Sequence, residues 1–205
     1  TKEMKKLSKH EGVAEYTPQE FDPSSKWLYF TANEGSEFKT LRRYQMATGR
    51  TEEVEKPDWD VTSAVFSRTG KYLLIASNAD GRTAIRLHDN GANRDASIPA
   101  LPAGEISSPR FSRSEKRLVF QLDSDRAPNN LYVWQIGSPS AQRLTDTLNP
   151  EIDVRDLVAS QVVRFRSFDG LTIPATFYKP QQASIESRAP ALVWVHGGPG
   201  GQTRR

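Results

Sequence analysis

The residues with the clearest chemical potential lie near the end of the chain. There, His196 is followed by four glycines and a proline within the next five positions, and an apolar run, residues 191–195, precedes it. Glycine permits positive φ and allows other groups to approach the main chain closely. A strand that opens into such a turn can present backbone N–H groups to an oxyanion that develops during acyl transfer. The alternative is a plain tight turn that joins a strand to a helix.

The rest of an acyl-transfer site is missing from the sequence. No Gly-x-Ser-x-Gly motif occurs, so the sequence offers no nucleophilic serine of the kind found on a strand–turn–helix elbow. Neither a catalytic acid nor a base can be assigned. We therefore expect that this chain is a fragment of an active enzyme and is inactive by itself.

Composition and charge exclude several classes. Hydrophobic residues are 36% and charged residues 26% of the 205 positions, a balance typical of soluble globular proteins with solvated sheet faces. The net charge is +3, but 28 basic residues are interspersed with 25 acidic ones, so we predict no nucleic-acid binding. No run reaches the length of a membrane span, and no membrane partner is predicted. The chain has no cysteine, which suits a cytoplasmic or a periplasmic location equally.

A repeat of 45 residues organises the first part of the chain. Phe21, Phe66 and Phe111 each begin a ten-residue segment, and the three segments align without a gap. A lysine and a leucine recur in register in all three. A polar turn follows each phenylalanine, and an apolar strand follows each turn: residues 27–31, 72–77 and 117–122. Third strands are predicted to begin at Leu41, Ile85 and Leu131 after polar loops, and polar fourth strands at 51–55, 94–98 and 141–145.

Four strands in about 45 residues predict a β-propeller blade. The Trp-Asp signature of WD repeats occurs only once, at Trp59-Asp60, so that class is set aside. Trp27, Tyr72 and Trp134 are expected to form core between blades. Because three blades cannot close a ring, further blades are expected before Thr1.

The pattern changes at about Thr147. After a connector, residues 148–159, alternating residues on both sides of Asp169-Gly170 predict a β-hairpin. Pro174 within its second strand predicts a sheet edge, because proline cannot donate to the ladder. Residues 191–195 are then predicted to form a strand buried on both faces. The expected domains are a partial propeller, residues 1–147, and a connector with the start of a second domain, residues 148–205.

This order of parts resembles the prolyl oligopeptidase family of serine peptidases, over residues 16–202. The residues that carry the resemblance are the repeated Phe-Ser-x-x-Gly-Lys-x-Leu pattern, the Ser-Phe-Asp-Gly hairpin at 167–170 and the His-Gly-Gly-Pro-Gly-Gly-Gln loop at 196–202. The His-Gly-Gly-Pro form is similar to acylaminoacyl-peptidases and bacterial dipeptidyl-aminopeptidase-like enzymes. The implied fold is mostly β: about three four-stranded blades of a β-propeller, followed by the first strands of an α/β-hydrolase domain.

The resemblance also implies the site and its chemistry. The loop of His196, Gly197, Gly198 and Pro199 would contribute to the oxyanion hole, with the backbone N–H of Gly198 as the expected donor. His196 would shape the loop and would not be the catalytic base, since the serine, acid and base of such folds follow this loop in the chain. The family implies hydrolysis of short peptides, a propeller that gates their access, and neither a metal nor an organic cofactor.

Other candidate residues favour structural roles. His10 and His88 are expected to be surface or packed histidines, and Glu52-Glu53 an exposed pair on a fourth strand. The spacing of Asp123, Asp125 and Asn129 does not match a calcium loop of the EF-hand type.

Two rival functions stay open at this stage. One is a propeller that binds a partner without catalysis and carries a vestigial hydrolase end; the other is an esterase or proline iminopeptidase with a similar loop, which would lack the preceding propeller. Exposed blade edges also predict some self-association.

Overall fold

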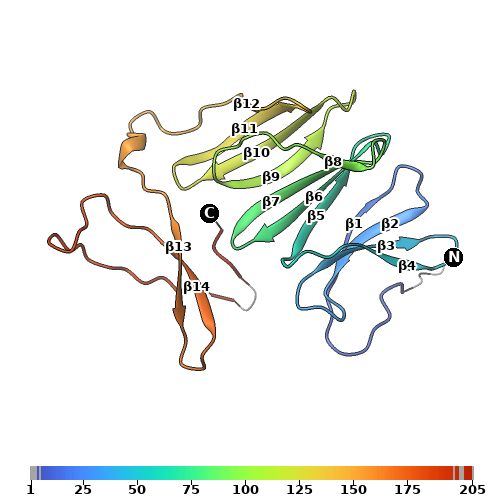
Figure 1. Ribbon diagram of the computed structural model, residues 1–205, viewed down its shortest axis with the longest axis horizontal. Coiled ribbons are helices and arrows are strands. Elements are labelled where there is room, and N and C mark those ends of the chain that lie inside the picture. Colours follow the sequence, from blue (N-terminus) through green and yellow to red (C-terminus); the bar gives the residue numbers. More distant parts are fainter. Residues whose placement is uncertain (1–3, 5, 196, 199–200, 205) are drawn as a thin grey trace.

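The computed structural model describes residues 4, 6–195, 197–198 and 201–204. Three four-stranded antiparallel sheets follow one another along the chain, and a two-stranded hairpin comes last (Figure 1). Each four-stranded sheet runs in simple meander order and corresponds to one predicted blade. The described residues contain no α-helix and one short 3₁₀ helix, η1 (Val154–Asp156). The mostly-β partial propeller is therefore confirmed.

The strand bounds follow the repeat closely. Blade 1 consists of β1 (Tyr16–Phe21), β2 (Trp27–Ala32), β3 (Thr40–Gln45) and β4 (Thr51–Glu55). Blade 2 consists of β5 (Val61–Phe66), β6 (Tyr72–Ala79), β7 (Arg82–Asp89) and β8 (Arg94–Ala96). Blade 3 consists of β9 (Glu105–Phe111), β10 (Arg117–Ser124), β11 (Ala127–Gln135) and β12 (Gln142–Arg143). The hairpin consists of β13 (Gln161–Arg166) and β14 (Thr172–Phe177).

The core lies between the blades. Strand β6 is buried along its first five residues because both of its faces are covered. On one face Leu73 and Ile75 join Tyr29 and Leu41 of blade 1. On the other face Tyr72, Leu74 and Leu87 join a cluster of blade 3 residues, Leu118, Phe120, Leu122, Tyr132 and Trp134. Because successive side chains of a strand point to opposite faces, β6 contributes residues to two separate hydrophobic cores.

The three aromatic residues expected between blades take different positions. Trp134 is fully buried, and its indole N–H donates to the carbonyl oxygen of Ser138 at 2.9 Å. Tyr72 stacks on Phe111 of blade 3 with a centroid distance of 6.1 Å. Trp27 is only partly buried and carries the Arg43 guanidinium over its ring at 4.2 Å. The prediction is confirmed for Tyr72 and Trp134, whereas Trp27 lies at the border of its cluster.

The turn between the first and second strands is built in the same way in all three blades. The residue after the repeated phenylalanine accepts a hydrogen bond from the backbone N–H five positions later, from Trp27 to Asp22, Tyr72 to Ser67 and Arg117 to Ser112, at 2.7, 2.9 and 3.1 Å. Three positions after the acceptor, the backbone enters the left-handed region, at Ser25 (φ 56°), Gly70 (φ 78°) and Glu115 (φ 59°). Only blade 2 has glycine there, so the residue type does not indicate this conformation in blades 1 and 3.

The predicted loop before the third strand of blade 3 is wrong. Strand β11 begins at Ala127, and Asn130 is 1% exposed inside it. Its side-chain oxygen accepts from the Thr145 hydroxyl and the Thr147 N–H at 3.0 and 3.2 Å, and its amide donates to the carbonyl oxygen of Pro128 at 2.9 Å. Because all these groups are paired, a polar residue is accommodated within a buried strand.

The predicted buried strand at residues 191–195 is also wrong. The segment has no strand assignment, and Leu192, Val193, Trp194 and Val195 are 82–89% exposed. A strand buried on both faces needs neighbouring strands and covering layers. Within the described residues, β13 and β14 pair only with each other, so the structure contains no α/β-hydrolase sheet for the segment to join.

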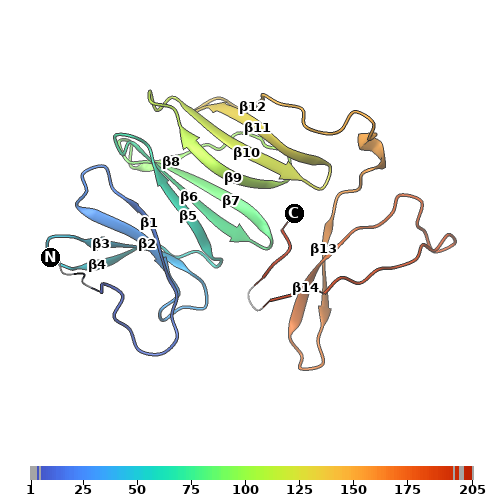
Figure 2. The same cartoon turned by 180° about the vertical axis from the view of Figure 1, so that it is seen from behind.

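Figures 1 and 2 show the hairpin standing apart from the blades, with the C-terminal segment running between the hairpin and blade 2. Along β13 and β14, Val163 pairs with Ala175 and Phe165 with Ile173, so these residues share one face. Val163 and Phe165 are 39% and 55% exposed. The alternation predicted from sequence is present, but the apolar face of the hairpin is only partly covered, since Ile173 and Ala175 are half-buried.

Candidate functional site

The glycine turn follows directly after the exposed segment 191–195. His196, Pro199 and Gly200 lie outside the described residues, so the structure describes only part of the predicted loop. Gly198 has a φ of +71°, and a Cβ placed there would meet no heavy atom within 4 Å. Its carbonyl oxygen accepts a hydrogen bond from the Gly201 N–H at 3.2 Å. The positive φ and the turn agree with the role of glycine expected from the sequence.

The residues after the turn rest against one end of the blades. Gln202 accepts a hydrogen bond from Asn78, at the end of β6, with an N···O distance of 2.5 Å. Arg204 forms an ion pair with Glu105, the first residue of β9, at 2.7 Å. The glycine turn is therefore held near the ends of blades 2 and 3, at the side where β6 runs into β7.

Two further contacts join the same end of the blades to the hairpin. Asp80, in the connection between β6 and β7, forms an ion pair with Arg164 of β13 at 2.5 Å. Asp125, in the connection between β10 and β11, accepts from the Tyr178 hydroxyl at 2.6 Å. The opposite oxygen of Asp125 accepts from the Ser160 N–H and hydroxyl at 2.8 and 2.5 Å. One carboxylate thus fixes both the start and the end of the hairpin to blade 3.

The electrostatics of this contact follow from its hydrogen bonds. Three effects raise the pKa of Tyr178. The largest is its hydrogen bond to the Asp125 carboxylate, and partial burial and the negative charge of Asp125 add to it. Tyr178 therefore stays a neutral donor, which matches an acceptor that is a carboxylate. Ser160 is 6% exposed, so this end of the connector is well shielded from water.

Of the Asp123, Asp125 and Asn129 cluster, only Asp125 serves this contact. Among the described residues, no group of three or more His, Cys, Asp or Glu side chains could hold a metal ion. Sequence reasoning noticed Asp125 but missed its role, because its partners lie 35 and 53 residues away in the chain.

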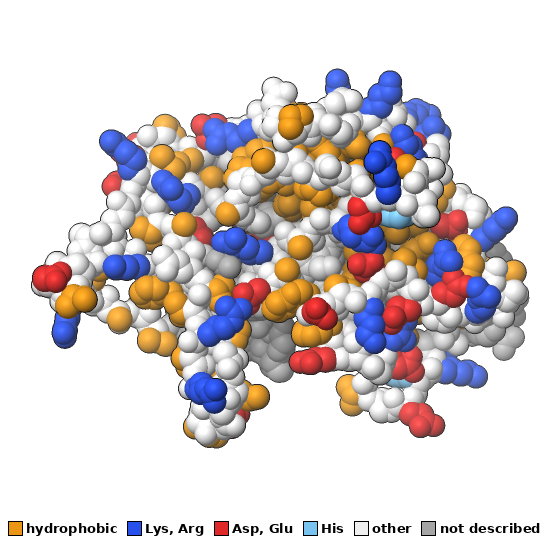
Figure 3. All heavy atoms as spheres, in the orientation of Figure 1, with side chains coloured by type: hydrophobic (Ala, Val, Ile, Leu, Met, Phe, Trp, Pro, Cys, Tyr) orange, Lys and Arg blue, Asp and Glu red, His pale blue; other side chains and the backbone are white. Residues whose placement is uncertain are grey.

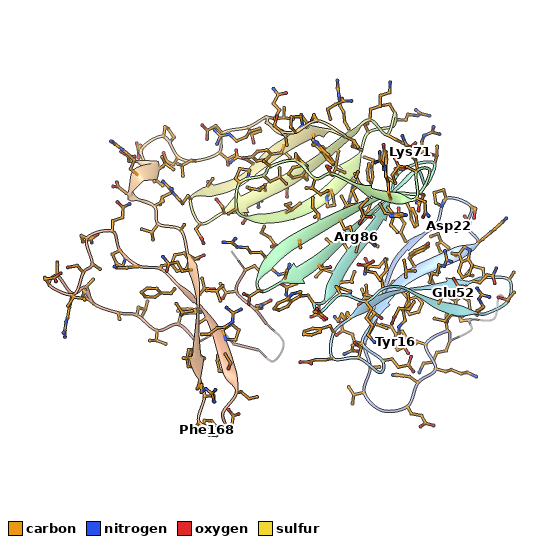
Figure 4. All side chains as sticks on the ribbon, viewed as in Figure 1. Tyr16, Asp22, Glu52, Lys71, Arg86 and Phe168 are labelled. Atoms are coloured by element: carbon orange, nitrogen blue, oxygen red, sulfur yellow. The ribbon has the colours of Figure 1, made fainter. Side chains whose placement is uncertain are left out.

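The other candidates have structural partners. Glu52 forms ion pairs with Arg43, at 2.5 Å, and with Arg50, so it is not the exposed carboxylate that we expected. His88 contacts Asp95 at 3.0 Å, and Asp95 also pairs with Arg86. Arg86 contacts Glu55 of blade 1 as well and so links two blades. Figure 4 shows Glu52 and Arg86 on the blades and Phe168 at the tip of the hairpin, away from the other labelled residues.

Across the part of the chain that the structure describes, no helix is long and apolar enough to cross a membrane.

Comparison with known proteins supports the fold. No family model matches the sequence, and no curated protein matches it. Among solved structures, the chain is similar to one from an analysis of two prolyl endopeptidases and their inter-domain dynamics, with a TM-score of 0.64, 17% identity and 87% of this chain covered. It is also similar to prolyl oligopeptidase B from Galerina marginata, bound to a 25mer macrocyclization substrate, with a TM-score of 0.63, 17% identity and 79% coverage of this chain. The same enzyme bound to a 35mer substrate gives a TM-score of 0.63 at 17% identity and 80% coverage.

The matched part is a minor share of those proteins. The chain covers 26%, 23% and 24% of the three solved chains, respectively. At this identity the similarity establishes a shared fold and no more.

Proposed function

We propose that this chain is a segment of a serine peptidase of the prolyl oligopeptidase family, comprising propeller blades in residues 1–147 and the start of the catalytic domain in residues 148–205. The observation that carries the proposal is the shared fold with prolyl oligopeptidases over 79–87% of the chain, followed in sequence by a His-Gly-Gly-Pro loop.

In this proposal the loop of His196, Gly197, Gly198 and Pro199 supplies part of the oxyanion hole. The positive φ of Gly198 and the free space around it are compatible with a backbone N–H directed at a substrate. The second donor would be the N–H of the residue after a serine nucleophile located outside this chain. A single donor of this kind typically contributes about 10²–10³ in rate.

The contacts at one end of the blades support the placement of the loop. Asn78, Asp80, Glu105 and Asp125 hold the C-terminal segment and the hairpin against that end. A peptide that reaches the loop would therefore pass beside the blades. This arrangement favours a propeller that limits access to short, unfolded peptides.

The test uses the protein expressed from the complete reading frame. We expect hydrolysis of an unstructured peptide of about ten residues and much slower hydrolysis of the same segment inside a folded protein. Hydrolysis of both substrates at equal rates would contradict gating by the propeller. Failure to hydrolyse any peptide, together with the absence of a reactive serine, would contradict the peptidase assignment. It would favour the alternative, a propeller that binds a partner without catalysis.

A further inference from the structure

The first strands of all three blades line one groove. It has a volume of about 590 Å³ and is formed by residues 19–20 of β1, residues 63–66 of β5 and residues 110–111 of β9, together with the turns that follow β5 and β9. In a meander, alternate connections lie at opposite ends of the sheet. The turns after β5 and β9 therefore lie at the end of the blades opposite to the hairpin contacts, so this groove is distinct from the candidate site.

Three arginines dominate the charge of the groove: Arg68, Arg110 and Arg113. Among the described residues, none of them lies within ion-pair distance of a carboxylate. Arg68 donates only to the carbonyl oxygen of Arg113, at 3.4 Å, and Arg110 only to that of Pro109, at 2.9 Å. Since a guanidinium carries five N–H donors, most of these donors have no protein partner.

The two nearby carboxylates accept hydrogen bonds from uncharged donors. Glu20 accepts from the Phe66 N–H at 2.7 Å and so covers the open edge of β5. Glu115 accepts from the Thr69 N–H and hydroxyl at 2.6 and 2.7 Å. Both bonds join neighbouring blades and so hold these carboxylates in place. Against the opposing effect of burial, the hydrogen bonds from Thr69 and the charge of Arg68 lower the pKa of Glu115, but neither carboxylate forms an ion pair with any of the three arginines. Figure 3 shows Lys and Arg side chains gathered at the upper right, over the ends of blades 2 and 3.

The aromatic residues of the groove help to decide whether it suits acidic peptides or nucleic acids, since both carry negative charge. Phe66 and Phe111 belong to the groove, but Phe66 packs edge-on against Tyr29, with a centroid distance of 4.9 Å, and Phe111 stacks on Tyr72 at 6.1 Å. Single-stranded nucleic acids usually bind through aromatic faces on which their bases stack. Because each aromatic ring of the groove already packs against a tyrosine ring, the chemistry of the groove suits carboxylates better than nucleobases.

We infer that the groove binds peptide segments rich in aspartate and glutamate, whose carboxylates pair with Arg68, Arg110 and Arg113. Arginine recognises carboxylates through two parallel N–H···O bonds, and the three guanidinium groups of the groove have N–H donors left for such bonds. The inference goes beyond the proposed peptidase activity, since it concerns binding at the opposite end of the blades and needs no catalytic group.

Fluorescence anisotropy on the protein that contains the complete chain tests this site. The probes are a labelled twelve-residue peptide of Asp, Glu and Ser, the same peptide with Asn and Gln in place of the acids, and a twelve-nucleotide single-stranded DNA. We expect the acidic peptide to bind at least about tenfold more tightly than the amide peptide or the DNA at moderate salt, and more weakly as salt screens the charges. Equal binding of the amide peptide, or DNA binding as tight as that of the acidic peptide, would overturn the inference.

A matched pair of variants locates the binding. The combination Arg68→Gln, Arg110→Gln and Arg113→Gln should weaken binding of the acidic peptide by about tenfold, since each exposed ion pair contributes a few-fold. The control combines Arg94→Gln, Arg166→Gln and Arg188→Gln. It removes the same charge from exposed arginines outside the groove and should change binding by less than about twofold. An equal loss in both triple variants would show that net charge, not the groove, is responsible. Both variants are first checked for an unchanged melting temperature.

Discussion

Leu74 offers the sharpest test of how the blades are held together. It is 0% exposed on β6 and faces the cluster shared by blades 2 and 3. Replacement by alanine removes the hydrophobic contribution of about three carbon groups, roughly 2.4 kcal/mol at about 0.8 kcal/mol each. The cavity left in a rigid interface adds to this cost, and buried Leu→Ala changes lie at about 2–5 kcal/mol. We therefore expect Leu74→Ala to lower the free energy of unfolding by about 3–4 kcal/mol.

The assay is thermal unfolding of the purified protein, followed by circular dichroism. For a chain of this size, 1 kcal/mol corresponds to about 2–4 °C, so the melting temperature should fall by roughly 6–16 °C. The control is Leu144→Ala, because Leu144 is 52% exposed and its loss should cost less than about 1 kcal/mol. Equal effects of the two substitutions would refute an interface packed around β6.

Three further predictions concern the turns and the hairpin. Ser25→Gly should stabilise the protein by up to about 1 kcal/mol, measured by chemical denaturation, because Ser25 is held at a φ of 56° and is exposed; a loss of stability would contradict left-handed strain. Gly104→Ala should unfold the start of blade 3, measured by hydrogen exchange, since the added Cβ would lie 2.1 Å from the Asp123 carbonyl oxygen; unchanged protection of β9 would contradict that contact. Asp125→Ala should speed proteolysis of the connector, residues 148–159, by about tenfold, because it removes the acceptor of Ser160 at the end of the connector as well as that of Tyr178; unchanged cleavage would show that Asp125 does not hold this region.

The sequence predicted the blades well because their determinants are local and repeated. A phenylalanine, a polar turn and an apolar strand recur every 45 residues, and the strand bounds agree with the structure within a few positions. The second strand of blade 2 was predicted as an apolar strand, and the structure buries it on both faces. Even so, the division of β6 between two cores depends on the order of the blades in space, which no single segment determines.

The turn geometry was harder to predict. Left-handed backbone at Gly70 could be anticipated from its residue type, but Ser25 and Glu115 adopt the same conformation without glycine. Hydrogen bonds across the turn hold this conformation. The backbone N–H of Ser25 and of Glu115 donates to the carbonyl oxygen three positions earlier, and the side chain of Asp22 or Ser112 accepts from the N–H five positions later. The lesson is that a repeat position can carry a conformation that its own residue type does not favour.

The candidate site was predicted only in part, because its contacts are long-range. Asp125 reaches Ser160 and Tyr178, and Asn78 reaches Gln202 across 124 positions. Residues 191–195 have the composition of a buried strand, yet the described residues provide no sheet beside them. Composition indicates what a segment can form, while burial requires a partner that a local pattern does not specify.

Labelling with a fluorophosphonate probe tests the central claim most directly. The protein expressed from the complete reading frame is treated with the probe, digested, and the modified residue is located by mass spectrometry. The account predicts one labelled serine, positioned after residue 205, and no label within residues 1–205. A labelled serine inside this segment, or no labelled serine anywhere in the protein, would contradict it.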